Sequence, residues 1–173
     1  NAMVTLTDSL KDEKFVKQVE AAVNVICKTS GRLVISGMGK SGIIGKKLVA
    51  TFASTGTPSL FLHPAEASHG DLGMLCKDDV LLLMSFSGES RELIDIIRYS
   101  KRFNVPIIAF TANANSTLGK AADILLQLPK VKESCPHNLA PTSSTLIQLA
   151  LGDALAITLL KEKGFSEEDF FNI

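Results

Sequence analysis

Apolar residues along the chain follow two alternating patterns, short β-rich runs and longer segments with helical spacing. The short runs are Arg32–Ser36, Ser59–His63, Asp79–Ser85, Pro106–Thr111 and Ile124–Leu128. The third run is apolar at nearly every position, which is typical of a strand covered on both faces. Strands that alternate with helices in this way predict an α/β fold, a five-stranded parallel sheet with helices on both faces.

The helical segments lie before, between and after these runs. The first is expected to begin at a cap formed by Thr7 or Asp8 and to end at Gly31. Further helices are expected after a glycine-rich turn, carrying Ile44 to Phe52 and stopped by Gly56, and then at Ser90–Phe103, at Ser116–Ala122 and from Ser166. The longest, about Ser143–Lys163, is apolar but interrupted by Gln148, and we expect a buried helix rather than a membrane span.

The composition fits one globular domain, expected to span residues 1–173, with Asn1 and Ala2 as the remains of an expression tag. Lysine plus arginine equals aspartate plus glutamate, at 18 each. A net charge of zero gives no general attraction to nucleic acid or to an anionic membrane. The three cysteines show no metal-binding spacing, which favours reduced thiols in a cytoplasmic protein.

A glycine-rich turn, Ser36–Gly42, follows the first predicted strand and matches G-x-G-x-x-G. A dinucleotide site would need an acidic residue near the end of the second strand, where the chain has His63. A P-loop would need a glycine where the chain has Val34. The remaining interpretation is a tight turn into a helix N-terminus that presents Lys40, with a merely solvated lysine as the alternative.

Two runs of hydroxyl side chains lie at the starts of predicted helices. Ser85–Ser90 follows the third strand, and its serines, its glycine and the helix N-terminus together favour a bound phosphate. The alternative there is an ordinary helix cap by Ser87 or Ser90. Thr142–Thr145, at the start of the longest helix, is open to the same two interpretations.

Ionisable side chains also follow the strands. The segment His63–Asp71 holds two histidines and two acids, which suit proton transfer or metal binding, although a lone histidine is more often structural. Glu92 and Glu133 follow the third and fifth strands, so both can reach the same edge of the sheet.

Together these segments resemble the SIS (sugar isomerase) domain family, and within it the arabinose-5-phosphate isomerase branch. The resemblance rests on GMGKSG at 37–42, ASTGTPSLFLHPAEASHGDLGM at 53–74, SGES at 87–90, KESCP at 132–136, LAPTSST at 139–145, LGDALA at 151–156 and GFSEEDF at 164–170. It implies a flavodoxin-like SIS fold and a cytoplasmic homotetramer. It also implies interconversion of D-ribulose 5-phosphate and D-arabinose 5-phosphate through an enediolate, for synthesis of Kdo, an acidic sugar of lipopolysaccharide and some capsules.

The resemblance also implies roles for individual residues. The catalytic positions are Lys40, Glu92, Glu133 and His69. We expect substrate binding by Gly39, Ser41, Gly56, Thr57, Ser85, Ser87, Gly88, Ser90, Thr142, Ser143 and Ser144. The mechanism requires no cofactor, and the family associates zinc with the position of His63. A sugar phosphate is the expected ligand, with neither nucleic acid nor membrane as a partner.

Three departures from the family pattern stand out. Ile43 stands where the family has a histidine. Phe86 stands where the family has an asparagine, in the segment Ser85–Ser90 that is predicted to bind phosphate and is called the phosphate loop below. A catalytic histidine in a following S-H-P-G-G segment is missing, as are the cystathionine-β-synthase-type domains of longer members, and this chain alone is expected to be poorly active. Two rivals therefore stay open: a non-catalytic SIS module that binds a sugar phosphate, and another aldose–ketose isomerase or aminosugar-phosphate enzyme.

Overall fold

The computed structural model describes residues 1–172 and is built on one parallel sheet with the strand order β2-β1-β3-β4-β5. The strands are β1 Leu33–Gly37, β2 Ser59–Phe61, β3 Val80–Met84, β4 Ile107–Thr111 and β5 Ile124–Gln127. Every neighbouring pair is parallel, so each strand ends at the same edge of the sheet. The predicted five-stranded α/β fold is confirmed.

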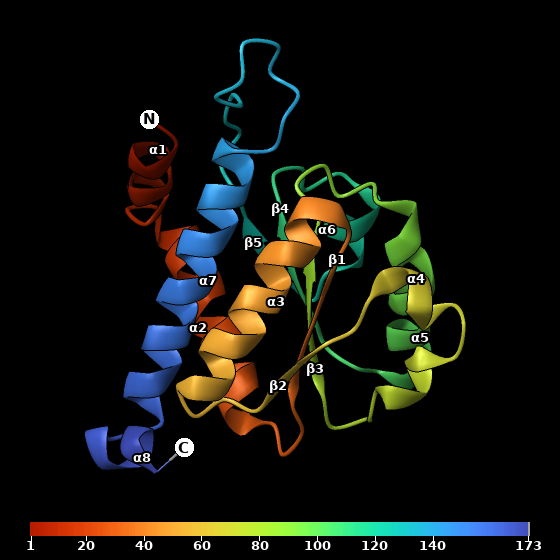
Figure 1. The fold of residues 1–173 in the computed structure, drawn as a ribbon, viewed down its shortest axis with the longest axis vertical. Coiled ribbons are helices and arrows are strands. Elements are labelled where there is room, and N and C mark those ends of the chain that lie inside the picture. The colour runs from red at the N-terminus through yellow and green to blue at the C-terminus, as the bar shows by residue number, and fades with distance from the viewer. Residues whose placement is uncertain (173) are drawn as a thin grey trace.

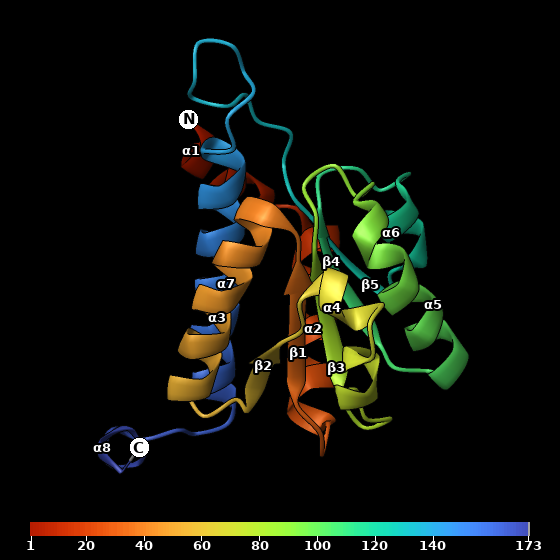
Figure 2. The ribbon, with the colours of Figure 1, turned by 45° about the vertical axis from the view of Figure 1, so that its right-hand side comes forward.

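Helices cover both faces of the sheet, as Figures 1 and 2 show. They are α1 Ala2–Ser9, α2 Glu13–Lys28, α3 Gly39–Ser54, α4 Pro64–Ala67, α5 Ile94–Phe103, α6 Thr117–Ala121, α7 Ser143–Glu162 and α8 Glu167–Phe171, with the 3-10 turns η1 Asp71–Met74 and η2 Arg91–Leu93. Alternate side chains of β1 enter two separate cores. Leu33 and Ile35 pack with α2, α3 and α7, whereas Val34 packs with α4, α5 and α6.

The prediction of one N-terminal helix capped by Thr7 or Asp8 is wrong. The structure has two helices there, and α2 is capped by Asp12, whose side chain accepts a hydrogen bond from the backbone N–H of Lys14 at 2.9 Å. Asp12 lies directly before the amphipathic stripe that Phe15 opens, so the cap is where the buried face begins. Helix α1 is held separately, because Leu6 is buried and α1 packs on α7.

Helix α7 is the one helix within residues 1–172 that is long and apolar enough to cross a membrane, yet half of that stretch is buried in the fold. It packs against α1, α2 and α3, and runs beside α3 in both views. An ion pair of 2.5 Å between Lys47 and Asp153 joins α3 to α7. About half of its apolar stretch is therefore covered within the chain, while Leu146 and Ile157 stay exposed.

The start of α3 approaches the end of β1 very closely. A Cβ atom at Gly42 would overlap the carbonyl group of Gly37, and one at Gly37 would press on the backbone of Met84 and Ser41. Glycine at both positions lets the helix lie directly against the strand. The contact fixes where the first turn of α3 sits at the carboxyl edge of the sheet.

Gly42→Ala is expected to lower the free energy of unfolding by roughly 1–3 kcal/mol, because the added methyl group meets backbone that cannot move aside. This loss should appear even though alanine favours a helix over glycine by about 1 kcal/mol. Urea denaturation measures the change. Gly73→Ala is the matched control, since open space surrounds Gly73, and its effect should stay within about 0.5 kcal/mol. Equal stability of wild type and Gly42→Ala would contradict the close approach.

Candidate functional site

The strand order changes direction between β1 and β3. The chain passes from β1 outward to β2 on one side and then returns to β3 on the other side of β1. Gly37, the last residue of β1, pairs with Met84, the last residue of β3. The loops that follow these strands are therefore neighbours, and ligands of open α/β sheets bind at such a switch point.

The first of these loops presents Lys40. Met38 precedes α3, Gly39 has a left-handed backbone (φ 59°), and Lys40 and Ser41 form the first turn of the helix. The Lys40 side chain is exposed and has no ion-pair partner within the described residues. Its charge is therefore free to meet an anion or a developing negative charge.

The second loop, Ser85–Ser90, is folded around its own hydroxyl groups. The hydroxyls of Ser85 and Ser90 are 2.9 Å apart, and Ser85 Oγ accepts a hydrogen bond from the N–H of Gly88 at 3.1 Å. The Ser87 hydroxyl accepts one from the N–H of Glu89 at 3.3 Å. Ser90 precedes η2, but its side chain makes no capping hydrogen bond, so Ser90 is not an ordinary helix cap. Converging hydroxyl and N–H groups of this kind suit a phosphate.

Glu133 lies at the N-terminus of α7. One of its carboxylate oxygens accepts hydrogen bonds from the N–H of Thr142 at 2.8 Å, the Thr142 hydroxyl at 3.1 Å and the N–H of Ser144 at 3.2 Å. Ser143 is buried, and its hydroxyl is 3.1 Å from that of Ser134. The hydroxyl-rich start of α7 is thus occupied by groups of the chain itself.

The protonation of Glu133 follows from this placement. Partial burial would raise the pKa of its carboxyl group, but hydrogen bonds from Ser144 and Thr142 outweigh burial and lower the pKa below its usual value. A carboxylate held in this way is charged at neutral pH and is a weaker base than a free one. Glu92 differs, because it lies exposed in η2, directly after the phosphate loop.

The histidine-bearing segment packs beside the turn that carries Glu92. His63 precedes α4, and α4 contacts both η2 and α5. Ser68 fixes the end of the segment through a hydrogen bond of 2.8 Å to Asp95, and the exposed His69 follows it. The segment therefore faces the same region as Glu92.

The described residues do not form a metal site. They contain no group of three or more histidine, cysteine, aspartate or glutamate side chains placed to hold an ion. The Nδ1 atom of His63 is buried without a hydrogen-bond partner, and His63 belongs to no such group of three. Residues 1–172 by themselves therefore do not provide a zinc ligand set at His63, and no chemical step is assigned to a metal.

Gly56 and Thr57 are not brought to this edge. They lie beyond the far end of α3, which is about 24 Å long at 1.5 Å per residue, and they precede β2 rather than follow it. Thr57 is buried and its hydroxyl accepts a hydrogen bond from Lys163 at 3.0 Å, while Phe165 packs on Gly56. Within one chain, both residues serve the packing of α7 on α3.

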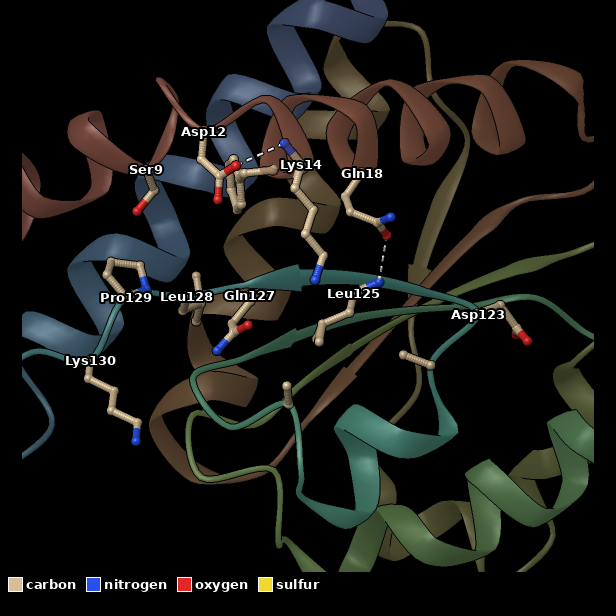
Figure 3. A pocket seen from close by; sticks show the side chains of 13 residues that line it. Ser9, Asp12, Lys14, Gln18, Asp123, Leu125, Gln127, Leu128, Pro129 and Lys130 are labelled. Atoms are coloured by element: carbon tan, nitrogen blue, oxygen red, sulfur yellow. Dashed lines mark hydrogen bonds between the residues drawn. The ribbon is translucent and has the colours of Figure 1, made fainter.

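A cavity of about 580 Å³ runs along the outer edge of β5, between α2 and α6 (Figure 3). None of the sequence-predicted site residues lines it. Its two carboxylates are already engaged, since Asp12 caps α2 and Asp123 binds Lys101 at 2.7 Å. Gln18 fills part of the strand edge by accepting a hydrogen bond from the N–H of Leu125. The switch-point loops, which gather the ionisable groups and hydroxyls, remain the better candidate site.

Contacts between the phosphate loop and the segment after β4 were not foreseen from the sequence. Glu89 accepts hydrogen bonds from both the N–H and the hydroxyl of Thr117, at 3.0 and 2.7 Å. Ser116 caps α6 by accepting a hydrogen bond from Gly119, as expected of a serine before a helix. No local pattern pairs Glu89 with Thr117, because the two meet only when β3 and β4 lie side by side.

Comparisons with known proteins identify relatives of this chain. The chain is 54% identical over 159 residues to the arabinose 5-phosphate isomerase KdsD of Francisella tularensis, and the match covers 92% of this chain and 48% of that protein. The chain spans about half the length of the curated relatives it matches. Among solved structures, the E. coli CFT073 protein c3406 in complex with arabinose 5-phosphate is 39% identical with a TM-score of 0.91, covering 98% of this chain and 89% of that one.

A more distant likeness shows the fold alone. The sugar isomerase domain of an RpiR transcription factor from Sphaerobacter thermophilus is 21% identical with a TM-score of 0.69, covering 95% of this chain and 94% of that one. The model of the SIS domain family matches residues 15–158, which include the glycine turn, the phosphate loop and most of α7. The chain therefore belongs to the SIS domain family.

Proposed function

We propose that this SIS domain interconverts D-ribulose 5-phosphate and D-arabinose 5-phosphate. The observation that carries the proposal is that Lys40 and the hydroxyl-lined phosphate loop follow neighbouring strands at the switch point of the sheet. The chain is also similar to a protein solved with arabinose 5-phosphate. Provision of a precursor for Kdo, a cytoplasmic location and a homotetramer are further parts of the proposal that come from the family resemblance.

Phosphate binding falls to the Ser85–Ser90 loop. The hydroxyls of Ser85 and Ser90 bond each other, and that of Ser87 accepts from the Glu89 N–H. A phosphate would replace these internal hydrogen bonds with bonds to a charged acceptor. Net charge over the chain is zero, so the local loop, rather than a general electrostatic field, must provide the affinity.

Proton transfer between C1 and C2 of the sugar needs a base and a cation near the oxygens, where negative charge develops. Within the described residues, Lys40 is an exposed cation at the switch point without an ion-pair partner. Glu92, exposed and next to the phosphate loop, suits the base, and His69 suits a shuttle of protons between the oxygens. Glu133, held at the start of α7 with a lowered pKa, suits a positioning role.

A second candidate function is a module that binds a sugar phosphate without converting it. The same fold occurs in the sugar isomerase domain of a transcription factor, so the fold does not decide between them. The capped state of Glu133 favours this candidate, because it leaves fewer free bases at the site.

The deciding experiment follows ribulose 5-phosphate and arabinose 5-phosphate in a coupled assay, with calorimetry on the same samples. The chain is compared with a version extended by Ser-His-Pro-Gly-Gly, since the family resemblance places a histidine there. Turnover by either version supports the isomerase. Binding of both sugar phosphates without turnover by either version supports the binding module.

Ser90→Ala and Ser87→Ala are expected to weaken binding of arabinose 5-phosphate while leaving the unphosphorylated sugar unaffected. Each lost hydrogen bond to a charged phosphate should cost roughly 1.5–3 kcal/mol, or about tenfold or more in affinity. Titration calorimetry measures the change. Ser30→Ala, at the amino edge of the sheet, is the matched control. Unchanged affinity in both loop variants would remove this loop from the site.

Lys40→Met is expected to lower kcat by about 10²–10³ with a smaller change in KM, because the cation acts mainly on charge that exists in the transition state. Steady-state kinetics on a version that turns over the sugar phosphate measure both constants. Lys161→Met, in the last turn of α7, is the control for loss of a surface charge. An intact kcat with a raised KM would make Lys40 a binding residue.

Glu133→Ala is expected to lower the free energy of unfolding at pH 7 by roughly 0.5–2 kcal/mol, the usual value of a lost helix cap. The folded-state pKa of Glu133 is lowered, so its stabilising effect is present above the unfolded-state pKa and is lost as pH falls through the folded-state pKa. The stability difference from wild type should therefore shrink in acid. Denaturation at several pH values between 7 and 3 measures it, and a difference that stays constant would contradict the capping role.

A further inference from the structure

Glu89 is a carboxylate in the middle of a loop that otherwise suits an anion. Ser87, Gly88 and Ser90 surround it in sequence, and a phosphate bound there would lie close to its backbone. Like charges repel, and the repulsion is stronger near a protein surface than in bulk water. A freely mobile Glu89 side chain would therefore oppose the ligand that the loop is proposed to bind.

The structure holds this carboxylate against the N-terminus of α6. One oxygen accepts a hydrogen bond from the Thr117 N–H at 3.0 Å, and the other accepts one from the Thr117 hydroxyl at 2.7 Å. Both donors belong to the first residue of α6 rather than to the loop itself. Two hydrogen bonds from one residue fix the carboxylate in both position and orientation.

The backbone of the loop is held from the same side. The carbonyl of Gly88 accepts a hydrogen bond from the Leu118 N–H at 3.0 Å, and that of Phe86 accepts one from the Ala112 N–H at 2.9 Å. Gly88 has a left-handed backbone (φ 74°), and a Cβ there would overlap the Ser116 hydroxyl. These backbone contacts hold the loop in shape without the Glu89 side chain. The hydrogen bonds between Glu89 and Thr117 are therefore free to serve a purpose other than shaping the loop.

The charge on Glu89 persists at neutral pH. Hydrogen bonds from the hydroxyl and then the N–H of Thr117 lower the pKa of Glu89, and nearby Lys120 lowers it further, against a small opposing effect of burial. Protonation therefore does not remove the conflict with a phosphate. Only the direction of the side chain does.

We propose that Thr117 acts as a charge mask, holding the Glu89 carboxylate on the α6 side of the loop so that it does not repel the phosphate of the substrate. Thr117 and Glu89 are then positioning residues, and neither touches the sugar. The inference rests on the proposed function, since it requires the Ser85–Ser90 loop to bind phosphate.

A charge mask and a simple structural tie make opposite predictions for a double substitution. If the pair only ties the loop to α6, removal of either partner weakens binding, and removal of both is at least as harmful. If Thr117 masks a charge, removal of the Thr117 hydroxyl is harmful only while Glu89 is charged. Glu89→Gln should then rescue Thr117→Val.

The experiment measures Kd for inorganic phosphate and arabinose 5-phosphate by calorimetry in wild type, Thr117→Val, Glu89→Gln and the double variant. Thr117→Val should raise both Kd values roughly three- to tenfold, the size expected for a carboxylate released several ångströms from a phosphate. Glu89→Gln and the double variant should both stay within about twofold of wild type, or bind more tightly. Thr117→Ser, which keeps the hydroxyl, should match wild type. Thr158→Val, on the exposed face of α7, is the matched control.

In a version that turns over the sugar phosphate, KM should follow these Kd values while kcat stays constant. A double variant that binds as weakly as Thr117→Val, or more weakly, overturns the charge mask and leaves the proposed function standing. Wild type that binds neither probe overturns both. Should Thr117→Val fail to fold, Glu89→Gln alone decides, because a loss of affinity beyond tenfold in that variant contradicts the mask.

Discussion

The close approach of α3 to β1 is the constraint on which the rest of the site depends. Gly42 lies against Gly37, and no other residue would fit without moving backbone. Since Gly37 pairs with Met84, the same contact sets the distance between the first turn of α3 and the loop after β3. Lys40 and the phosphate loop therefore reach one region because backbone packs on backbone, without any direct bond between their side chains.

The proposed anion site of this domain relies on few charges. The phosphate loop offers hydroxyl and N–H groups, and Lys40 lies in the neighbouring loop at the end of β1. Two of the acidic side chains around the site are restrained by neutral donors, Glu89 by Thr117 and Glu133 by Thr142 and Ser144. In both cases the hydrogen bonds that fix the carboxylate come from neutral groups rather than from a lysine or an arginine. At the proposed site, this restraint would keep a bound phosphate apart from the acids that the loops themselves contain.

Two sequence features found their neighbours only once the elements were packed. The apolar residues of α7 exceed one helical stripe; α1, α2 and α3 pack on part of them, while Leu146 and Ile157 stay exposed. Gly56 and Thr57 belong to a motif typical of the family, yet they lie at the amino edge of the sheet, one helix length from the phosphate loop. In both cases the pattern was read correctly as a local feature, and its neighbours in space were not predictable from it.

The sequence by itself determined the α/β class, the strands and most helices, because apolar periodicity and glycine turns are local signals. It also determined that hydroxyls and ionisable groups follow the strands, and parallel pairing places them at one edge. Only the tertiary structure decided the strand order, and with it the meeting of Lys40 and Ser85–Ser90. Likewise, the hydrogen bonds from Thr117 to Glu89 and from the start of α7 to Glu133 join residues that are far apart in the chain or separated by a loop. Such contacts depend on packing that no local pattern encodes.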